Sequence, residues 1–167
     1  MVILIIGISL ILDGILTNYL PFLPNDLSLF TPLLTITSLV LIYPFFRKQE
    51  KNYYISLFIT GIIYDLFYTN LLFFHAVIFL LLGVIIRFIY KNYEITPIRI
   101  IIYISIIIIC YEFLEGFILY IFQIVPVSIE KILYKIKHSL IINLVWGEII
   151  YGILKIYIKK TKKISMN

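Results

Sequence analysis

Five carboxylic acids stand inside apolar stretches of this 167-residue chain. They are Asp13, Asp65, Glu112, Glu115 and Glu148. An ionised group in such surroundings is expensive, so it usually has a partner or a task. Two further polar residues in similar surroundings could act with them, namely His75 and Asn143. Because Glu112 and Glu115 are three residues apart, they share one face of a helix, where both would not ionise readily without a cation.

These residue types do not form the pattern of a known catalytic site. The chain has no G-x-S-x-G elbow, no H-E-x-x-H motif and no phosphate-binding P-loop. The spacing Glu112-x-x-Glu115 resembles the paired glutamates of intramembrane CAAX-type proteases, which also need His and Asn motifs on other helices. His138 and Asn143 fit that spacing poorly. We therefore expect no catalytic residue, no metal site and no cofactor.

Composition indicates an integral membrane protein. Hydrophobic residues make up 62% of the chain and charged residues 14%, against roughly a half and a quarter in soluble domains. The length suits a single membrane domain, residues 1–167, with spans of about 20 residues each. The single cysteine, Cys110, excludes an intrachain disulfide. The net charge of +5 arises at the ends of apolar stretches, so we expect no nucleic-acid partner.

The apolar stretches predict an all-α membrane protein with six transmembrane helices, at residues 2–20, 29–46, 53–68, 71–90, 100–122 and 139–158. The first stretch lacks the basic start and cleavage site of a signal peptide, so we expect it to be retained. A single helix over residues 53–90 would span about 57 Å, nearly twice the hydrocarbon core of about 30 Å. A tight hairpin at Thr69 and Asn70 is therefore predicted.

The basic residues predict the orientation. With the N-terminus inside, eleven of the 14 Lys and Arg residues fall on the cytoplasmic side and three on the outer side, which predicts two cytoplasmic termini. The three outer residues lie in 129–138, where Ile129, Ile132, Leu133 and Ile136 recur at helical spacing. We interpret this stretch as a short amphipathic helix on the outer surface, outside the core; an ordinary polar connector is the alternative.

This topology places every intramembrane acid in the outer half of the bilayer. One hypothesis is that the polar groups line an outward-open cavity or a groove that receives a partner. The alternative is that each acid only reaches the membrane surface or bonds a neighbouring helix. The basic C-terminal tail either touches anionic membrane lipid or only fixes the topology.

Residues 58–72, FITGIIYDLFYTNLL, resemble the central signature of the rod shape-determining protein MreD family. That signature has a glycine, three intervening residues and an aspartate, then a short turn and a second apolar helix. Gly61 and Asp65 fall on the matching positions, and Gly61 would let a neighbouring helix approach closely. Phe73 is a departure, because many members have a glycine there.

Weaker similarities extend over most of the chain. They are Asp13-Gly14 before Pro21 and Pro24, the basic loop at 43–51, Glu112, and residues 139–143. The resemblance implies a non-enzymatic protein of the bacterial cytoplasmic membrane. Its implied partners are the single-span protein MreC and the complex that directs side-wall peptidoglycan synthesis. Asp65 and the Glu112/Glu115 pair would contact the partner or brace the helices.

The resemblance also implies a fold similar to the six-helix substrate-binding components of energy-coupling-factor vitamin transporters. This leaves an alternative function, a small-molecule, vitamin-like binding component of a membrane transporter. Those components commonly dock their partner through AxxxA on the first helix. Here the first predicted helix has no alanine, which counts against the alternative.

Overall fold

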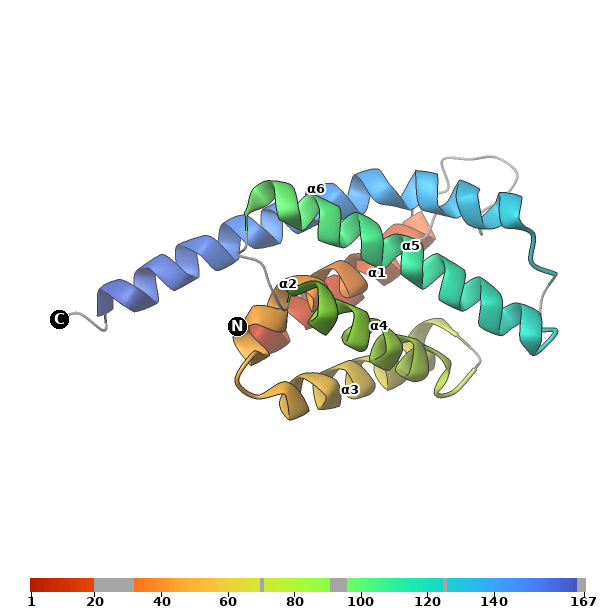
Figure 1. Cartoon of the computed structure of the whole chain (residues 1–167), viewed down its shortest axis with the longest axis horizontal. Helices are drawn as coiled ribbons and strands as arrows, with labels where there is room; N and C mark the ends of the chain where they lie inside the picture. Colours follow the sequence, from red (N-terminus) through yellow and green to blue (C-terminus); the bar gives the residue numbers. More distant parts are fainter. Residues whose placement is uncertain (20–31, 70, 91–95, 125, 165–167) are drawn as a thin grey trace.

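All regular secondary structure in the described residues is α-helical. This computed structural model describes residues 1–19, 32–69, 71–90, 96–124 and 126–164, which form six helices and no strand (Figure 1). The helices are α1 (Val2–Tyr19), α2 (Leu34–Phe46), α3 (Glu50–Tyr68), α4 (Phe74–Tyr90), α5 (Pro97–Ile121) and α6 (Ile129–Ile164). The predicted all-α class is confirmed.

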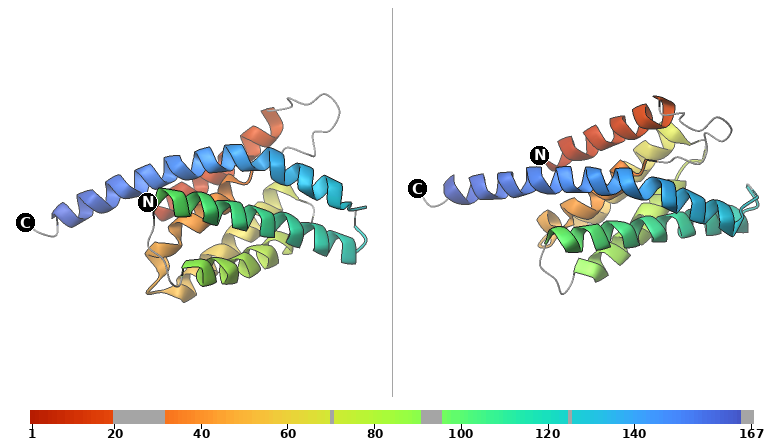
Figure 2. Two further views of the ribbon diagram at one scale, coloured as in Figure 1. Left: turned by 45° about the horizontal axis from the view of Figure 1, so that its top comes forward. Right: turned by 90° about the horizontal axis from the view of Figure 1, so that it is seen from above.

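The helices run back and forth between two ends of the molecule. One end, called the hairpin end here, holds the α3–α4 and α5–α6 turns, the end of α1 and the start of α2. The other, called the termini end, holds Met1 and the α2–α3 turn. With 36 residues, about 54 Å, α6 runs along the whole molecule and extends beyond the other helices at the termini end (Figure 2).

The centre of the fold is α2. It contacts each of the other five helices, and residues 34–43 are all buried. A helix buried on every side must bond its polar groups to neighbours. Ser38 does so, because its hydroxyl meets that of Ser9 on α1 and accepts a hydrogen bond from Trp146 Nε1 on α6 at 3.2 Å. One polar contact therefore joins α1, α2 and α6.

The last helix differs most from the sequence prediction. Residues 129–138 form the first part of α6 without a break, so the prediction that they form a separate helix is wrong. Neither proline nor glycine interrupts the chain between Ile129 and Trp146, so nothing ends the helix. Ile132 and Ile136 are only 8% exposed. Ile132 packs against Gly116 of α5, so this stretch is part of the packed helix bundle.

Other helix boundaries shift by a few residues. α2 begins at Leu34 rather than 29; Pro32 and Leu33 precede it, and residues 29–31 lie outside the described part. α3 begins at Glu50, three residues early, and α4 begins three residues late, at Phe74. Phe73 has φ 67°, in the left-handed region, which explains that late start.

The helices differ in whether they are long and apolar enough to span a bilayer. Among the described residues, α5 and the Ile129–Ile158 part of α6 are long and apolar enough to cross a membrane. Three shorter apolar segments accompany them: Val2–Thr17, Leu34–Phe46 and Phe74–Tyr90. Large apolar side chains such as Ile3 (86%), Phe88 (79%) and Ile141 (74%) are exposed on different helices. Apolar surface on this scale fits a membrane protein.

Candidate functional site

Asp65, in the last turn of α3, ties the α3–α4 hairpin together. Its side chain is fully buried, and both carboxylate oxygens lie 3.0 Å from the backbone nitrogen of His75. Oδ1 also lies 2.7 Å from His75 Nδ1 and 3.1 Å from the Thr69 hydroxyl. The first N–H groups of a helix have no partner within it, and Asp65 supplies one to the start of α4. The burial of the carboxylate is tolerated because these donors surround it.

Gly61 lies one turn before Asp65, on the same face of α3. A Cβ atom there would lie 2.4 Å from Ala76 Cα and 2.6 Å from Ala76 N. No side chain fits this space, so α3 and α4 meet backbone to backbone. The absence of glycine at Phe73 therefore does not prevent close packing of α4, which takes place three residues later.

His75 extends the contact to α5. Its Nε2 atom lies 3.0 Å from the Tyr111 hydroxyl, and its ring packs on Tyr64 with centroids 4.6 Å apart. With its proton on Nδ1, a neutral imidazole donates to Asp65 and accepts from the Tyr111 O–H. A continuous polar chain, Asp65–His75–Tyr111, thus joins α3, α4 and α5.

Asp13 binds the start of the central helix. Its side chain is 1% exposed, and its oxygens accept hydrogen bonds from the backbone N–H groups of Leu34 and Thr35, each at 2.8 Å. A carboxylate also suits the positive end of the α2 dipole. Asp13 therefore caps α2 from α1, across a chain separation of more than 20 residues.

Asn143, on α6, caps the same helix. Its Oδ1 atom accepts from Leu33 N at 3.1 Å and from the Thr37 hydroxyl at 3.2 Å. Its own Nδ2 donates to the Ser139 carbonyl at 2.7 Å, which fixes the amide orientation. Adjacent amides at the start of α2 are therefore held by α1 and α6.

The remaining glutamates have different surroundings. Glu115 Oε2 lies 3.5 Å from Lys135 Nζ, and both side chains are partly exposed. Glu112 is buried, with 1% of it exposed. Glu148 is on α6, and its buried Oε1 atom has no hydrogen-bond donor among the described residues. The Glu112/Glu115 pair is thus one buried carboxyl and one carboxylate with a lysine beside it.

A cavity of about 340 Å³ lies among these groups at the hairpin end. Its lining comes from α1, α3, α4 and α5, together with Pro32 and Thr69 from the adjoining turns. The polar lining residues are Asp13, Thr17, Tyr64, Tyr68, Thr69, His75, Tyr111 and Glu115. Its volume is within the range of about 300–1,000 Å³ that is typical of ligand pockets. The described residues contain no group of three or more His, Cys, Asp or Glu placed to hold a metal ion.

The structure thus gathers most of the polar residues singled out in the sequence. Asp13, His75 and Glu115 line the cavity, and Asp65 stands behind His75. Asn143 bonds the start of α2, and neither Asn143 nor Glu148 is in the cavity lining. The sequence reasoning missed the tyrosines Tyr64, Tyr68 and Tyr111 and the hydroxyls of Thr17 and Thr69. Tyrosines count as apolar in a hydropathy pattern, although each carries a polar tip.

Comparison with known protein families gives a match over nearly the whole chain. A family model described as rod shape-determining protein MreD matches residues 1–161 of the 167. No curated protein and no solved structure matches the chain. The expected similarity to the substrate-binding components of energy-coupling-factor transporters therefore stays a prediction.

Proposed function

Since this chain belongs to the MreD family, whose members take part in determining rod shape, we propose that it is a non-enzymatic membrane scaffold for MreC. In this proposal it holds MreC, and through it the side-wall peptidoglycan synthase complex, in a working arrangement. The hairpin end receives the partner. The observation that carries the proposal is the polar cavity at that end, whose walls are fixed by bonds between helices.

The proposed topology has six spans, with the termini end in the cytoplasm and the hairpin end at the outer surface. The distribution of Lys and Arg supports it, because Arg47, Lys48, Arg87 and Arg99 all belong to the termini end. The 13 residues of α2 reach only about 20 Å. Local thinning of the bilayer would accommodate this short central helix.

The polar residues divide into two roles. Asp65, Asp13 and Asn143 are buried, and their side-chain atoms bond neighbouring helices, which supports a role as braces. The accessible groups around the cavity are candidates for the partner contact. Thr17 is exposed, Phe67 is 76% exposed, and Glu115 is partly exposed beside Lys135.

Rigid walls favour docking at this cavity. Binding to a site that is already ordered avoids the entropy cost of ordering it on contact. The lining includes the exposed aromatic side chain of Phe67 and the carboxylate of Glu115, which has Lys135 beside it. The outer end of a membrane span, where apolar sequence gives way to polar sequence, has matching chemistry. We therefore assign the contact to the outer end of the MreC span.

The size of the cavity also supports a second candidate function, the binding of a small molecule. A small polar molecule would fit about 340 Å³ lined by carboxylates and hydroxyls, as the transporter alternative requires. A thermal-shift screen with vitamins separates the two functions. Stabilisation by a vitamin would favour the transporter alternative, whereas a screen without any shift would leave the scaffold role as proposed.

Co-purification with MreC tests the scaffold role. We expect Thr17→Trp, which fills the cavity mouth, and Glu115→Lys, which reverses its charge, to reduce the yield of MreC several-fold and to round the cells. Glu130→Lys is the matched control, because Glu130 is exposed at the same end but lies outside the cavity lining. Unchanged yield and shape with both cavity variants would refute docking at this site.

A further inference from the structure

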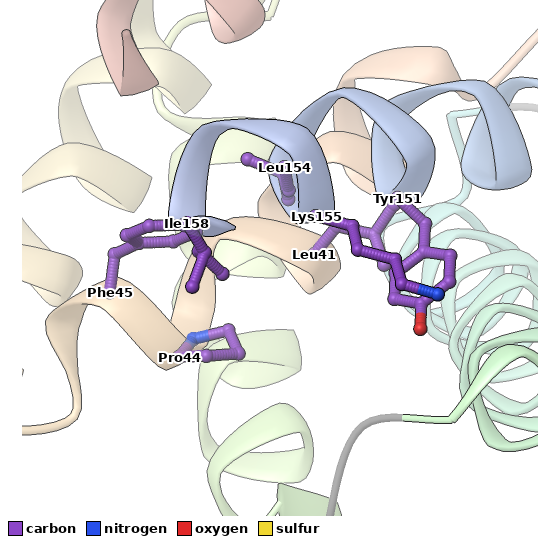
Figure 3. Close-up of a pocket in the computed structure, with 7 residues that line it drawn as sticks. All are labelled: Leu41, Pro44, Phe45, Tyr151, Leu154, Lys155 and Ile158. Carbon is purple, nitrogen blue, oxygen red and sulfur yellow. The ribbon is translucent and has the colours of Figure 1, made fainter. Parts of the chain in front are cut away.

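A second groove lies between α2 and α6, near the termini end, and takes no part in the contacts described above (Figure 3). Its volume is about 270 Å³. One wall consists of Leu41, Pro44 and Phe45 of α2. The opposite wall consists of Tyr151, Leu154, Lys155 and Ile158 of α6.

The groove follows from how the two helices end. Each wall uses positions three and four residues apart, which lie on one helix face. α2 contains Pro44 and ends two residues later, at Phe46, whereas α6 continues to Ile164. Leu41 and Leu154 are buried at the base, and Phe45 and Ile158 are about 40% exposed at the rim. The result is an apolar slot with an open side.

Lys155 makes one edge of this slot polar. Figure 3 shows its Nζ atom beside the hydroxyl of Tyr151, whereas the other five side chains are hydrocarbon. The ammonium lies 5.9 Å from the centroid of the Tyr151 ring. Within the described part of the chain, no carboxylate forms an ion pair with it. A cation and a phenol thus stand together beside an apolar slot.

We propose that this groove binds an anionic phospholipid, with part of an acyl chain between α2 and α6 and the phosphate at Lys155. The slot matches a hydrocarbon chain, and the ammonium matches a negative headgroup. Its volume is below the range that is typical of pockets for drug-sized ligands, and this small volume suits a section of an acyl chain. Four more lysines, at positions 159, 160, 162 and 163, follow on the same helix. Such basic clusters beside a membrane attract anionic lipid.

Lipid fits this groove better than a partner helix does. The α6 wall covers only two turns, from Tyr151 to Ile158, and includes a cation. A transmembrane partner would instead need a longer apolar face. Lipid binding here requires only that the groove faces the lipid bilayer. It does not depend on MreC binding at the hairpin end, so either proposal can fail alone.

Native mass spectrometry of the full chain in detergent tests the site. Phosphatidylglycerol and phosphatidylcholine with identical acyl chains are the two probes. We expect the wild type to retain phosphatidylglycerol at least about threefold better. Lys155→Gln should abolish this preference, and Ile158→Trp, which fills the exposed rim, should reduce binding of both lipids. Lys137→Gln is the matched control, since it removes an exposed charge from α6 near its other end.

The outcomes separate the possibilities. Equal retention of both lipids by the wild type would overturn the headgroup assignment. Full phosphatidylglycerol binding by Lys155→Gln, or an equal loss with Lys137→Gln, would overturn the role of Lys155. Unchanged binding by Ile158→Trp would exclude the slot as the acyl-chain site. Circular dichroism of each variant checks that the helices are intact.

Discussion

Asp65 Oδ1 lies 2.7 Å from His75 Nδ1, and the same carboxylate also accepts the backbone N–H of His75. The side chain of one helix thus binds both the ring and the backbone at the start of the next helix. Since Nε2 of the same ring reaches Tyr111, the contact fixes the position of α5 as well. This buried acid of an apolar sequence is therefore the centre of a bonded network, and its role follows from its partners.

Removing the Asp65 carboxylate should destabilise the protein. We expect Asp65→Leu to lower the free energy of unfolding by about 2 kcal/mol, because it leaves a buried N–H group unsatisfied. Asp65→Asn should cost less, since its amide oxygen still accepts one hydrogen bond. Thermal unfolding in detergent measures both variants. Wild-type stability in Asp65→Leu would contradict the bracing role.

Gly61 should not tolerate even one methyl group. A Cβ atom there meets the backbone of Ala76, so Gly61→Ala must push α3 and α4 apart, at a cost of about 1–3 kcal/mol. Gly152→Ala is the control, because a Cβ atom at Gly152 meets nothing within 4 Å. That change should be neutral or stabilise α6 by up to about 1 kcal/mol. Equal effects of the two substitutions on the melting temperature would argue against close packing at Gly61.

The two caps of α2 should act together. Asp13→Ala and Asn143→Ala each remove an acceptor from the start of α2, at a cost of about 1–2 kcal/mol. Because the bonded amides of Leu33 and Leu34 are adjacent, a double-mutant cycle should give a coupling energy of at least about 0.5 kcal/mol. Strict additivity of the two unfolding free energies would show that the caps are independent.

The apolar stretches of the sequence were enough to predict six helices and the α3–α4 hairpin. The span limit of a bilayer required a turn near Thr69, and Gly61 and Asp65 are close to that turn. The continuity of α6 was also available from the sequence, since no helix breaker separates 129–138 from Trp146. The polarity of that stretch led instead to the wrong prediction of a separate surface helix.

The details of the cavity could not be predicted in the same way. The caps from Asp13 and Asn143 depend on contacts across 21 and 110 residues, and spacing along one helix carries no information about them. The pairing of Ser9 with Ser38 is of the same kind. The burial of each acid also depends on how the helices pack. The sequence alone therefore could not separate the buried acids that brace the helices from the accessible ones.

The proposed orientation can be tested by cysteine labelling in intact cells. In a Cys110→Ala background, Ser128→Cys marks the hairpin end and Lys48→Cys marks the termini end. Both native side chains are exposed. An impermeant maleimide should label Ser128→Cys without permeabilisation and Lys48→Cys only after it. The opposite pattern would place the hairpin end in the cytoplasm.

Site-specific photocrosslinking in cells tests whether MreC docks at the hairpin end. Phe67 and Phe88 are matched positions, because both are exposed phenylalanines, at 76% and 79%, near opposite ends of the molecule. A photoreactive phenylalanine derivative replaces each in turn in growing cells. We expect a crosslink to MreC from position 67 and little or none from position 88. A crosslink from position 88 alone would contradict docking at the hairpin end.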